Sequence, residues 1–494
     1  MGIRIQSVRT QSTRTAPLKH FLYSLSFFLL MTDKTAGQQL QERLFTKKQH
    51  AHNLLDATEV EAFAQEYKTF LSENKTEREV ITTLVALAEK AGFANIANVG
   101  GVEAGKTYYK VDNNKNLALV RFSGLKSIHA VASHVDSPCL HLKPYPLAES
   151  NKLGMLKTHY YGGVKKYQWL NIPLALRGVA HTQEGTRVDV RLGEDGPCFT
   201  IPDLLPHLAK DQLKKEAREV VSGEQLNAIA ATIPYEDEKV KDKVKLALAI
   251  KLNEQYGLTE EDFLSAELSL VPAGPARDAG IDASLILGYG HDDRSCTYAS
   301  ARAILDAKKA THTQIALFYD KEEIGSYGRT GAQNLFMQRL IEELLELSET
   351  DLRPSQVWEK TNILSADVTA AVDPNFSDVH DTSNATYIGY GVALEKYGGS
   401  GGKYSTNDAD AEYMHALTTL FKQHNVPWQT GELGKVDQGG GGTIAMFLAR
   451  HGANVVDMGP AVLGMHAPYE LLAKHDLFST YKAYNTFFEH SLPK

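Results

Sequence analysis

Cysteine is scarce in this sequence of 494 residues, which contains three: Cys139, Cys198 and Cys296. The number is odd and no two of them are closely spaced. Neither a disulfide framework nor a zinc site built from thiolates is therefore indicated. This pattern favours a reducing compartment, and we expect a cytoplasmic protein.

An excess of basic charge is also missing. Lysine and arginine total 52 against 60 aspartates and glutamates, a formal net charge of -8. Proteins that bind nucleic acid need positive charge for the phosphate backbone, so nucleic acid is not an expected partner. The glycine clusters at 398–402 and 439–442 lack a phosphate-binding spacing and are expected to be flexible loops.

No apolar run is long enough to span a bilayer. The nearest candidate is Phe21–Met31, which follows Arg4, Arg9, Arg14 and Lys19. It resembles a signal peptide or an interfacial anchor, but no small-x-small cleavage site follows it. We prefer a start codon assigned too far upstream, with Met31 as the true initiator. Residues 1–31 are then an extension outside the fold, and no stable membrane insertion is expected.

The chain is longer than one core usually supports, and 43% of its residues are hydrophobic, so we expect more than one globular domain. A helix is indicated by a capping box at Thr76 and Glu79, an apolar stripe and a terminal Gly92. Further helices are predicted at 297–307 and 409–423, and short buried strands at 117–122, 129–133, 314–319, 362–365 and 454–456. This alternation predicts an α/β fold.

The middle third of the sequence has a different residue pattern. Strands are predicted at 168–176, 178–181 and 187–192, followed by charged amphipathic segments at 209–221 and 236–256 that we expect to be solvated helices. We interpret residues 147–270 as an inserted, largely β domain. The catalytic domain is then discontinuous and comprises residues 32–146 plus 271–494.

Acidic and histidine residues recur where predicted strands end, which is where open α/β sheets bind ligands. The first is His134, with Asp136 two residues later. Residues two apart on an extended segment project to the same side, so His134 can bind a metal while Asp136 accepts its other ring proton. Taken alone, a histidine after a strand is more often a hydrogen-bonded structural residue.

Two further positions suit a two-metal site. Asp292 opens a predicted helix, and its two oxygens can each take one cation, although helix capping explains an isolated aspartate equally well. Glu322 and Glu323 follow the strand at 314–319. Adjacent glutamates are ordinarily surface charge; here Glu323 can bind metal while Glu322 acts as general base.

Asp367 and His466 complete the set, each after a short predicted strand. Asp367 could instead cap a turn, and His466 could be a core histidine. Together, the five nitrogen and oxygen ligands suit two divalent metal ions per subunit, with zinc preferred and cobalt or manganese as alternatives.

Five ordered motifs carry a resemblance to a known family. They are Ser-His-Val-Asp-Ser-Pro-Cys from Ser133, His-Asp-Asp-Arg from His291, Lys-Glu-Glu-Ile-Gly-Ser from Lys321, Ser-Ala-Asp from Ser365 and Met-His-Ala from Met465. Beyond about residue 45, the chain resembles the aspartyl aminopeptidase and vacuolar aminopeptidase I family of dinuclear zinc exopeptidases, as a bacterial-type member.

The resemblance implies a mixed-sheet catalytic domain with helices on both faces, interrupted by a domain that mediates dimerisation, with dimers assembling into a dodecamer. It also implies that His134 and Asp367 bind one zinc and Glu323 and His466 the other, with Asp292 bridging and Glu322 as base. His207, in Ile201–Leu208, matches a histidine that lines the neighbouring subunit's active site. Lys396 corresponds to a substrate-contacting lysine only if a gap is introduced.

The sequence also departs from aspartyl aminopeptidases. The glycine-rich stretch that ends in Trp-Phe-Asp-Arg there is replaced by Tyr161–Asn171, and Ala370 and Asp373 stand where those enzymes have histidines. These changes lie near the expected substrate-facing wall, so the preference for acidic substrates does not transfer with the metal ligands.

The resemblance thus predicts an aminopeptidase that acts on peptide substrates, with Glu322 deprotonating the attacking water. A metal-dependent deacetylase or amidase of the same fold is an alternative. A third possibility is a catalytically silent assembly protein, which predicts decayed metal ligands, and no decay is seen.

Overall fold

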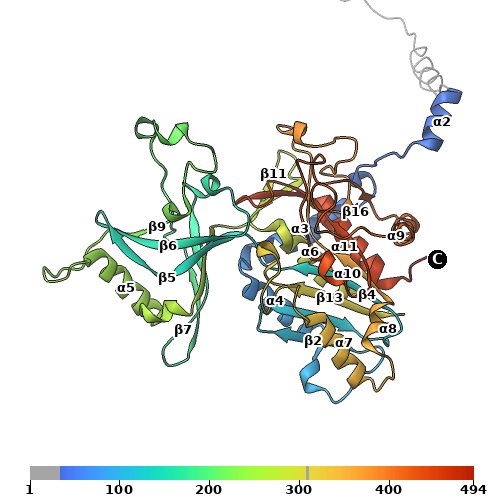
Figure 1. Ribbon diagram of the computed structural model, residues 1–494, viewed down its shortest axis with the longest axis horizontal. Helices are drawn as coiled ribbons and strands as arrows, with labels where there is room; N and C mark the ends of the chain where they lie inside the picture. Colours follow the sequence, from blue (N-terminus) through green and yellow to red (C-terminus); the bar gives the residue numbers. More distant parts are fainter. Residues whose placement is uncertain (1–33, 308–310, 494) are drawn as a thin grey trace, which may run out of the picture. The chain divides into compact units, whose positions relative to one another are not determined.

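A computed structural model describes residues 34–307 and 311–493 (Figure 1). Two compact units divide at Lys48. The described part of the first contains helix α2 (Ala36–Leu44), which is capped by Thr35 and buries none of its residues. The predicted N-terminal extension lies outside the described residues. Within these limits, no helix is long and apolar enough to cross a membrane.

The second unit is built around a mixed nine-stranded sheet in the order β1-β2-β3-β13-β4-β14-β18-β16-β17. Strands β13, β4, β14 and β18 run parallel at its centre. Its strands are β1 (Ala94–Asn95), β2 (Thr107–Asp112), β3 (Asn116–Arg121), β4 (Ile128–His134), β13 (Thr313–Tyr319), β14 (Thr361–Ser365), β16 (Val392–Glu395), β17 (Trp428–Gln429) and β18 (Asn454–Gly459). The central strands that the apolar runs predict are therefore present.

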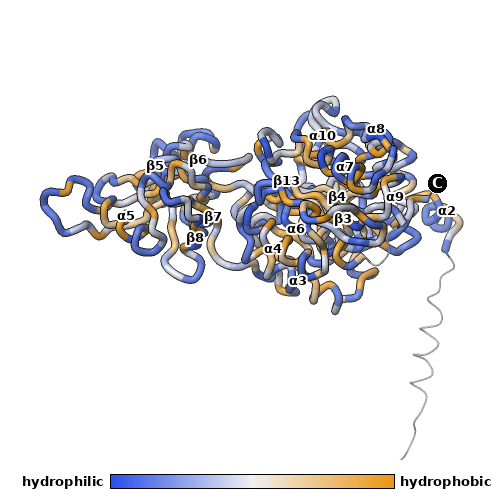
Figure 2. Tube along the Cα trace, turned by 90° about the horizontal axis from the view of Figure 1, so that it is seen from below, coloured by the Kyte–Doolittle hydropathy of each residue, from blue (hydrophilic) through white to orange (hydrophobic). Residues whose placement is uncertain are grey.

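Helices cover both faces of this sheet, as predicted. Alternate residues of a strand point to opposite faces, and Val131 of β4 packs into one core whereas Ala130 and Ala132 pack into the other. Figure 2 shows α7, α8 and α10 on one side of β3, β4 and β13, and α3, α4 and α6 on the other. The helices are α3 (Ala57–Glu73), α4 (Glu77–Lys90), α6 (His291–Asp306), α7 (Phe336–Leu347), α8 (Pro354–Trp358), α9 (Ala411–Gln423), α10 (Ala445–Ala449) and α11 (Lys474–Glu489).

The capping box of α4 is present. The Thr76 hydroxyl accepts from the backbone N–H of Glu79, whose carboxylate accepts from the N–H of Thr76. Val80, Ile81 and Leu84 on the predicted apolar stripe are fully buried. Local sequence therefore determines where this helix begins and which face it buries.

A second, antiparallel sheet of six strands interrupts the sequence between β4 and α6. Its order is β8-β7-β10-β5-β6-β9, and it packs with helix α5 (Lys243–Tyr256) around a separate apolar core. The strands are β5 (Cys139–Ser150), β6 (Leu153–Tyr161), β7 (Leu174–His181), β8 (Arg187–Leu192), β9 (Ala228–Ala231) and β10 (Glu267–Pro272). The division of the chain into the two predicted domains stays a prediction.

Two details of the prediction for this region are wrong. The strand predicted at 168–176 begins only at Leu174, because Pro173 lacks an N–H and Asn171 has a positive φ of 58°. The segment 209–221 is not helical apart from a single turn at Gln212–Lys214. Of its apolar side chains, only Ala209 and Val221 at its two ends are buried, whereas Leu213 is 74% exposed, so little apolar packing would stabilise a helix there.

A third sheet of five strands borders the site described below. It has the order β11-β12-β20-β19-β15. The strands are β11 (Arg277–Ala279), β12 (Leu285–Gly288), β15 (Thr369–Ala370), β19 (Ala461–Leu463) and β20 (Glu470–Ala473). Just after β20, the buried carboxylate of Asp476 accepts from the backbone N–H groups of Gly389 (2.6 Å) and Gly391 (2.7 Å) and so anchors that loop to α11.

Charged pairs join the six-stranded sheet to α4 and β3. The Glu267 carboxylate on β10 contacts the guanidinium of Arg78 at 2.6 Å and the ammonium of Lys115 at 3.2 Å. Burial would raise the pKa of Glu267, but these two cations lower it to about 2. The ionised form of Glu267 is therefore favoured in the folded protein.

This pKa shift predicts a pH-dependent contribution to stability. The ordinary pKa of the carboxyl is 4.5, so its stabilising effect is complete above that pH and is lost as the pH falls toward 2. We expect Glu267→Gln to lower the unfolding temperature at pH 7, and the gap from the wild type to narrow between pH 5 and 3.5. Thermal unfolding followed by circular dichroism tests this. A gap that widens on acidification would contradict it.

Candidate metal centre

The predicted ligands are brought together at one edge of the central sheet. His134 ends β4, Glu323 follows β13 and Asp367 follows β14, three strands that are parallel neighbours. Their carboxyl ends meet at this edge. Asp292 arrives from the start of α6, and His466 from the turn between β19 and β20.

Asp292 stands between the two histidines. Its Oδ1 lies 3.1 Å from His134 Nε2, and its Oδ2 lies 3.3 Å from His466 Nε2. His134 Nε2 is also 3.7 Å from Asp367 Oδ1, and His466 Nε2 is 3.5 Å from Glu323 Oε2. Two ligand groups result, one with His134 and Asp367 and the other with His466 and Glu323, and they share one carboxylate.

The donor set fits metal ions. Ligand atoms of His134, Asp292 and Glu323 lie within 4.8 Å of one another, as do those of His134, Glu322 and Asp367. Glu323 Oε1 is buried and accepts no hydrogen bond in the described part of the chain, and Asp292 Oδ1 faces only the Nε2 of His134 there, which is itself a predicted ligand atom. Buried carboxylate oxygens normally have partners, so a coordinated cation would satisfy Glu323 Oε1 and separate the two ligand atoms that now face each other.

The electrostatics of the cluster agree with that fit. Burial lowers the pKa of His466, but the carboxylates of Asp292 and Glu323 raise it to about 10. Burial and the negative charge of Asp292 raise the pKa of Glu323 well above its ordinary value. Protons thus offset a surplus of negative charge here, and a metal cation would displace them.

Glu322 occupies a different position from Glu323. It lies in the short turn Glu322–Ile324, and its carboxylate is close to His134 and Asp367. Burial, together with the negative charge of Asp367, raises its pKa to about 8. A carboxyl with such a pKa can both accept and donate a proton near neutral pH.

Asp136 connects several parts of the centre, as its spacing from His134 predicts. Its Oδ1 is 3.2 Å from His134 Nδ1, and it accepts hydrogen bonds from the backbone N–H groups of Glu322 and Glu323. The Tyr161 hydroxyl donates to its Oδ2 at 2.7 Å. Asp136 therefore orients the ring of His134 so that Nε2 faces the other ligands.

A loop that follows β6 of the six-stranded sheet closes one side of the centre. His466 Nδ1 lies 3.0 Å from the carbonyl oxygen of Gly163, which leaves Nε2 for a metal. A Cβ on Gly163 would come within 3.1 Å of His466 Nδ1, and one on Gly162 within 3.3 Å of Glu323 Oε2. These glycines therefore allow the loop to approach the ligands closely.

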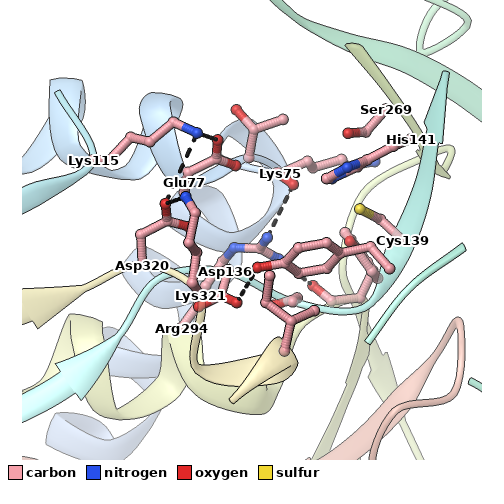
Figure 3. Close-up of a pocket in the computed structure, with 15 residues that line it drawn as sticks. Lys75, Glu77, Lys115, Asp136, Cys139, His141, Ser269, Arg294, Asp320 and Lys321 are labelled. Carbon is pink, nitrogen blue, oxygen red and sulfur yellow. Dashed lines mark hydrogen bonds and ion pairs between the residues drawn. The ribbon is translucent and has the colours of Figure 1, made fainter. Parts of the chain in front are cut away.

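A cavity of about 280 Å³ lies behind Asp136, between the two larger sheets. Figure 3 shows Asp136 on its wall and the ammonium of Lys115 between Glu77 and Asp320. Four of the charged groups that line this cavity pair with one another, namely Glu77, Lys115, Asp320 and Lys321. Lys75 and Arg294 donate to backbone carbonyls. Asp136 lies on the wall of this cavity, and none of the five predicted ligands lines it.

Two carboxylates beside the centre are not predicted from the sequence. Asp293 accepts from the backbone N–H of His134 at 3.3 Å, and Glu470 accepts from the N–H groups of Asp292 and His466. In the sequence, Asp293 is distinguishable only as a candidate helix cap. Glu470 lies four residues after His466, a spacing that becomes informative only once the turn between them is known.

Two predicted substrate contacts are not joined to this centre within the described chain. His207 lies in the exposed turn Pro206–Leu208 and makes no hydrogen bond or ion pair with the ligands among the described residues. The ammonium of Lys396 pairs with the Asp408 carboxylate, which also holds Lys403. Both substrate roles stay predictions.

Comparison with known proteins places this geometry in a family. The family model described as "Aminopeptidase I zinc metalloprotease (M18)" matches residues 70–488. The chain belongs to the M18 family of zinc metallo-aminopeptidases, which hydrolyse peptide bonds.

Bacterial relatives resemble the chain over nearly their whole length. The "Probable M18 family aminopeptidase 1" of Thermotoga maritima is 46% identical over 438 residues, which cover 87% of this chain and 96% of the relative. A protein of the same name in Clostridium acetobutylicum is 45% identical over 445 residues, which cover 87% and 95%.

Solved structures of the family share the fold. The crystal structure of the M18 aminopeptidase of Thermotoga maritima has a TM-score of 0.87 at 45% identity and covers 90% of this chain and 100% of that one. Aminopeptidase I of Clostridium acetobutylicum gives 0.85 at 42% identity, with the same coverage. A yeast aminopeptidase 1 dodecamer, 23% identical, gives 0.71 over 87% of this chain and 97% of that one, and so shares the fold.

The contacts of Asp136 predict that it controls metal affinity. Asp136→Asn replaces one carboxylate oxygen by an amide nitrogen, either opposite His134 Nδ1 or opposite Tyr161, while the backbone carbonyl of Asp136 stays 3.1 Å from His134 Nδ1. Changes at such supporting positions typically weaken metal binding about 10–100-fold. We expect zinc affinity to fall by that factor, measured by competition with a chromophoric chelator. Tyr161→Phe is the matched control: it keeps the carboxylate and should cost less. Unchanged affinity in Asp136→Asn would contradict the role.

Proposed function

We propose that this M18 enzyme removes N-terminal residues from peptides at a dinuclear zinc centre, with Glu322 as general base. The observation that carries the proposal is the placement of Asp292, whose two oxygens face different histidines. A carboxylate with one oxygen directed to each of two ligand groups is the arrangement that two-metal hydrolases use to share a bridging ligand.

His134 and Asp367 would hold one metal, Glu323 and His466 the other, and Asp292 both. When bound, the metals supply Lewis-acid polarisation and lower the pKa of coordinated water. Zinc is preferred from the donor types and the family description; cobalt and manganese suit the same donors.

Glu322 would take a proton from the attacking water and deliver it to the departing amine. Burial and the charge of Asp367 raise the pKa of Glu322, whereas the positive charge of bound metals would lower it, and a value between these limits suits both transfers near neutral pH. Because its carboxylate also lies close to His134 and Asp367, Glu322 could in principle be a ligand itself. Glu322→Gln keeps the shape of the side chain but removes its basicity, and it therefore distinguishes a general base from a metal ligand.

The assembly is also part of the proposal. We propose that residues 147–270 form a dimerisation domain, that residues 32–146 and 271–494 form the catalytic domain, and that dimers assemble into a dodecamer in the cytoplasm. The exposed side chains of Leu204, Leu205 and Leu208 around His207 support an interface there, and the yeast aminopeptidase 1 with the same fold is a dodecamer. His207 would then reach a neighbouring subunit's active site.

Replacement of Glu322 by glutamine tests the base. We expect Glu322→Gln to lose at least about 100-fold in kcat, since general base catalysis typically contributes 10²–10⁴-fold. Its metal content should equal that of the wild type. Activity on an aminoacyl reporter and metal analysis by mass spectrometry measure the two quantities. Full activity would remove the base assignment, and loss of one metal would make Glu322 a ligand.

A panel of reporters tests the reaction and the specificity. Metal-loaded enzyme should cleave aminoacyl reporters and leave N-acetylated compounds intact. Because Ala370 and Asp373 replace histidines of the aspartyl enzymes, we expect no preference for acidic first residues. Cleavage of only the N-acetylated compounds would favour a deacetylase or amidase. No cleavage of either class would favour a catalytically silent protein.

A further inference from the structure

Glu470 joins the two chain segments that carry Asp292 and His466. Its Oε1 accepts the backbone N–H of His466 at 2.7 Å, and its Oε2 accepts the N–H of Asp292 at 3.1 Å. The side chain is 1% exposed. One buried carboxylate therefore spans two predicted ligands that are far apart in the chain.

Neither segment has regular structure at the ligand itself. His466 has a φ of 64°, and it follows Gly464 with a φ of 73°. Asp292 has non-helical backbone angles inside the first turn of α6, and Gly290 before it has a φ of 77°. Each N–H would lack a regular backbone partner, and Glu470 supplies one for both.

The position of Glu470 follows from the third sheet. Glu470 begins β20, and in the antiparallel pairing with β12 it lies opposite Gly288, four residues before Asp292. The same strand is reached from His466 through a three-residue turn. The β-ladder thus fixes the carboxylate between the two ligands.

We propose that Glu470 is a positioning residue that sets the separation of Asp292 from His466, and thereby the affinity of the centre for the metal that Glu323 and His466 would hold. This inference rests on the proposed dinuclear function. Glu470 touches no substrate and no reacting atom. It acts through the backbone of two ligands.

The alternative is a purely structural carboxylate, and the chain offers a matched example. Asp476 is also fully buried and also accepts from two backbone N–H groups, those of Gly389 and Gly391. Neither glycine belongs to the metal centre. Removal of one acceptor oxygen from Asp476 therefore shows how much stability and zinc affinity the protein loses when a buried acceptor of N–H groups outside the metal centre is removed.

The experiment compares Glu470→Gln with Asp476→Asn in the full-length protein. In each variant an amide nitrogen replaces one acceptor oxygen and faces a backbone N–H that also donates. Zinc binding is titrated against a chelator, and the visible spectrum of the cobalt-substituted protein reports the geometry at the metals. Circular dichroism checks folding, and kcat and KM are measured at low and at saturating zinc.

We expect Asp476→Asn to bind two zinc ions, each with the same affinity as in the wild type. The two proteins should also give the same cobalt spectrum. Glu470→Gln should bind its weaker zinc about 10–100-fold less tightly and give an altered spectrum. Its kcat should be low at limiting zinc and recover substantially at saturating zinc, with KM nearly unchanged. Glu470→Asp keeps the charge but reaches only one N–H, so it should also lower the affinity for the weaker zinc. It replaces Glu470→Gln in the experiment if the glutamine variant does not fold.

Two results would overturn the inference separately from the proposed function. If the wild type binds two zinc ions and both Glu470 variants match it in affinity and spectrum, Glu470 does not position the ligands. If Asp476→Asn loses the second zinc to the same extent, the effect is general destabilisation. A wild type that binds fewer than two zinc ions overturns the dinuclear centre itself, and this inference with it.

Discussion

The structure around the predicted centre depends on one electrostatic constraint, the mutual repulsion of carboxylates that are buried together. Asp292, Glu323 and Asp367 converge with His134 and His466, and all of these side chains are largely buried except that of His466, which is 35% exposed. Buried charges of one sign are costly unless cations or protons offset them. The raised pKa values of Glu322 and Glu323 express this cost, and two bound cations would remove most of it.

The surrounding groups hold the ligands in place against this repulsion. Asp136 orients His134 from behind, while Asp293 and Glu470 accept the backbone N–H groups of the two histidines. Three carboxylates thus act on ligand geometry without belonging to the predicted ligand set.

The six-stranded sheet contributes to the centre as well as forming a separate core. Tyr161 at the end of β6 donates to Asp136, and the carbonyl of Gly163 fixes the ring of His466. This loop lies within Tyr161–Asn171, one of the two stretches in which the sequence departs from the aspartyl aminopeptidases. Because the loop contacts the ligands directly, its sequence can alter the shape of the substrate site while the ligands stay unchanged.

Much of the molecule is determined locally and can be read from the sequence. The capping box at Thr76 and the apolar runs of the central strands depend on short-range periodicity, and the structure contains both. The roles of the predicted ligands stay predictions. The structure joins Asp136 to His134 as expected, because a two-residue spacing on an extended segment has one geometric outcome.

Only the tertiary structure decided the features that depend on distant segments. The role of Glu470 requires the register of β20 against β12, and that of Gly163 requires a loop from another sheet to reach His466. The amphipathic pattern at 209–221 predicted a helix, but Leu213 in its middle stays exposed, so the pattern alone did not produce one. Local patterns placed the predicted ligands along the chain, whereas strand pairing across long sequence separations determined which side chains contact each of them.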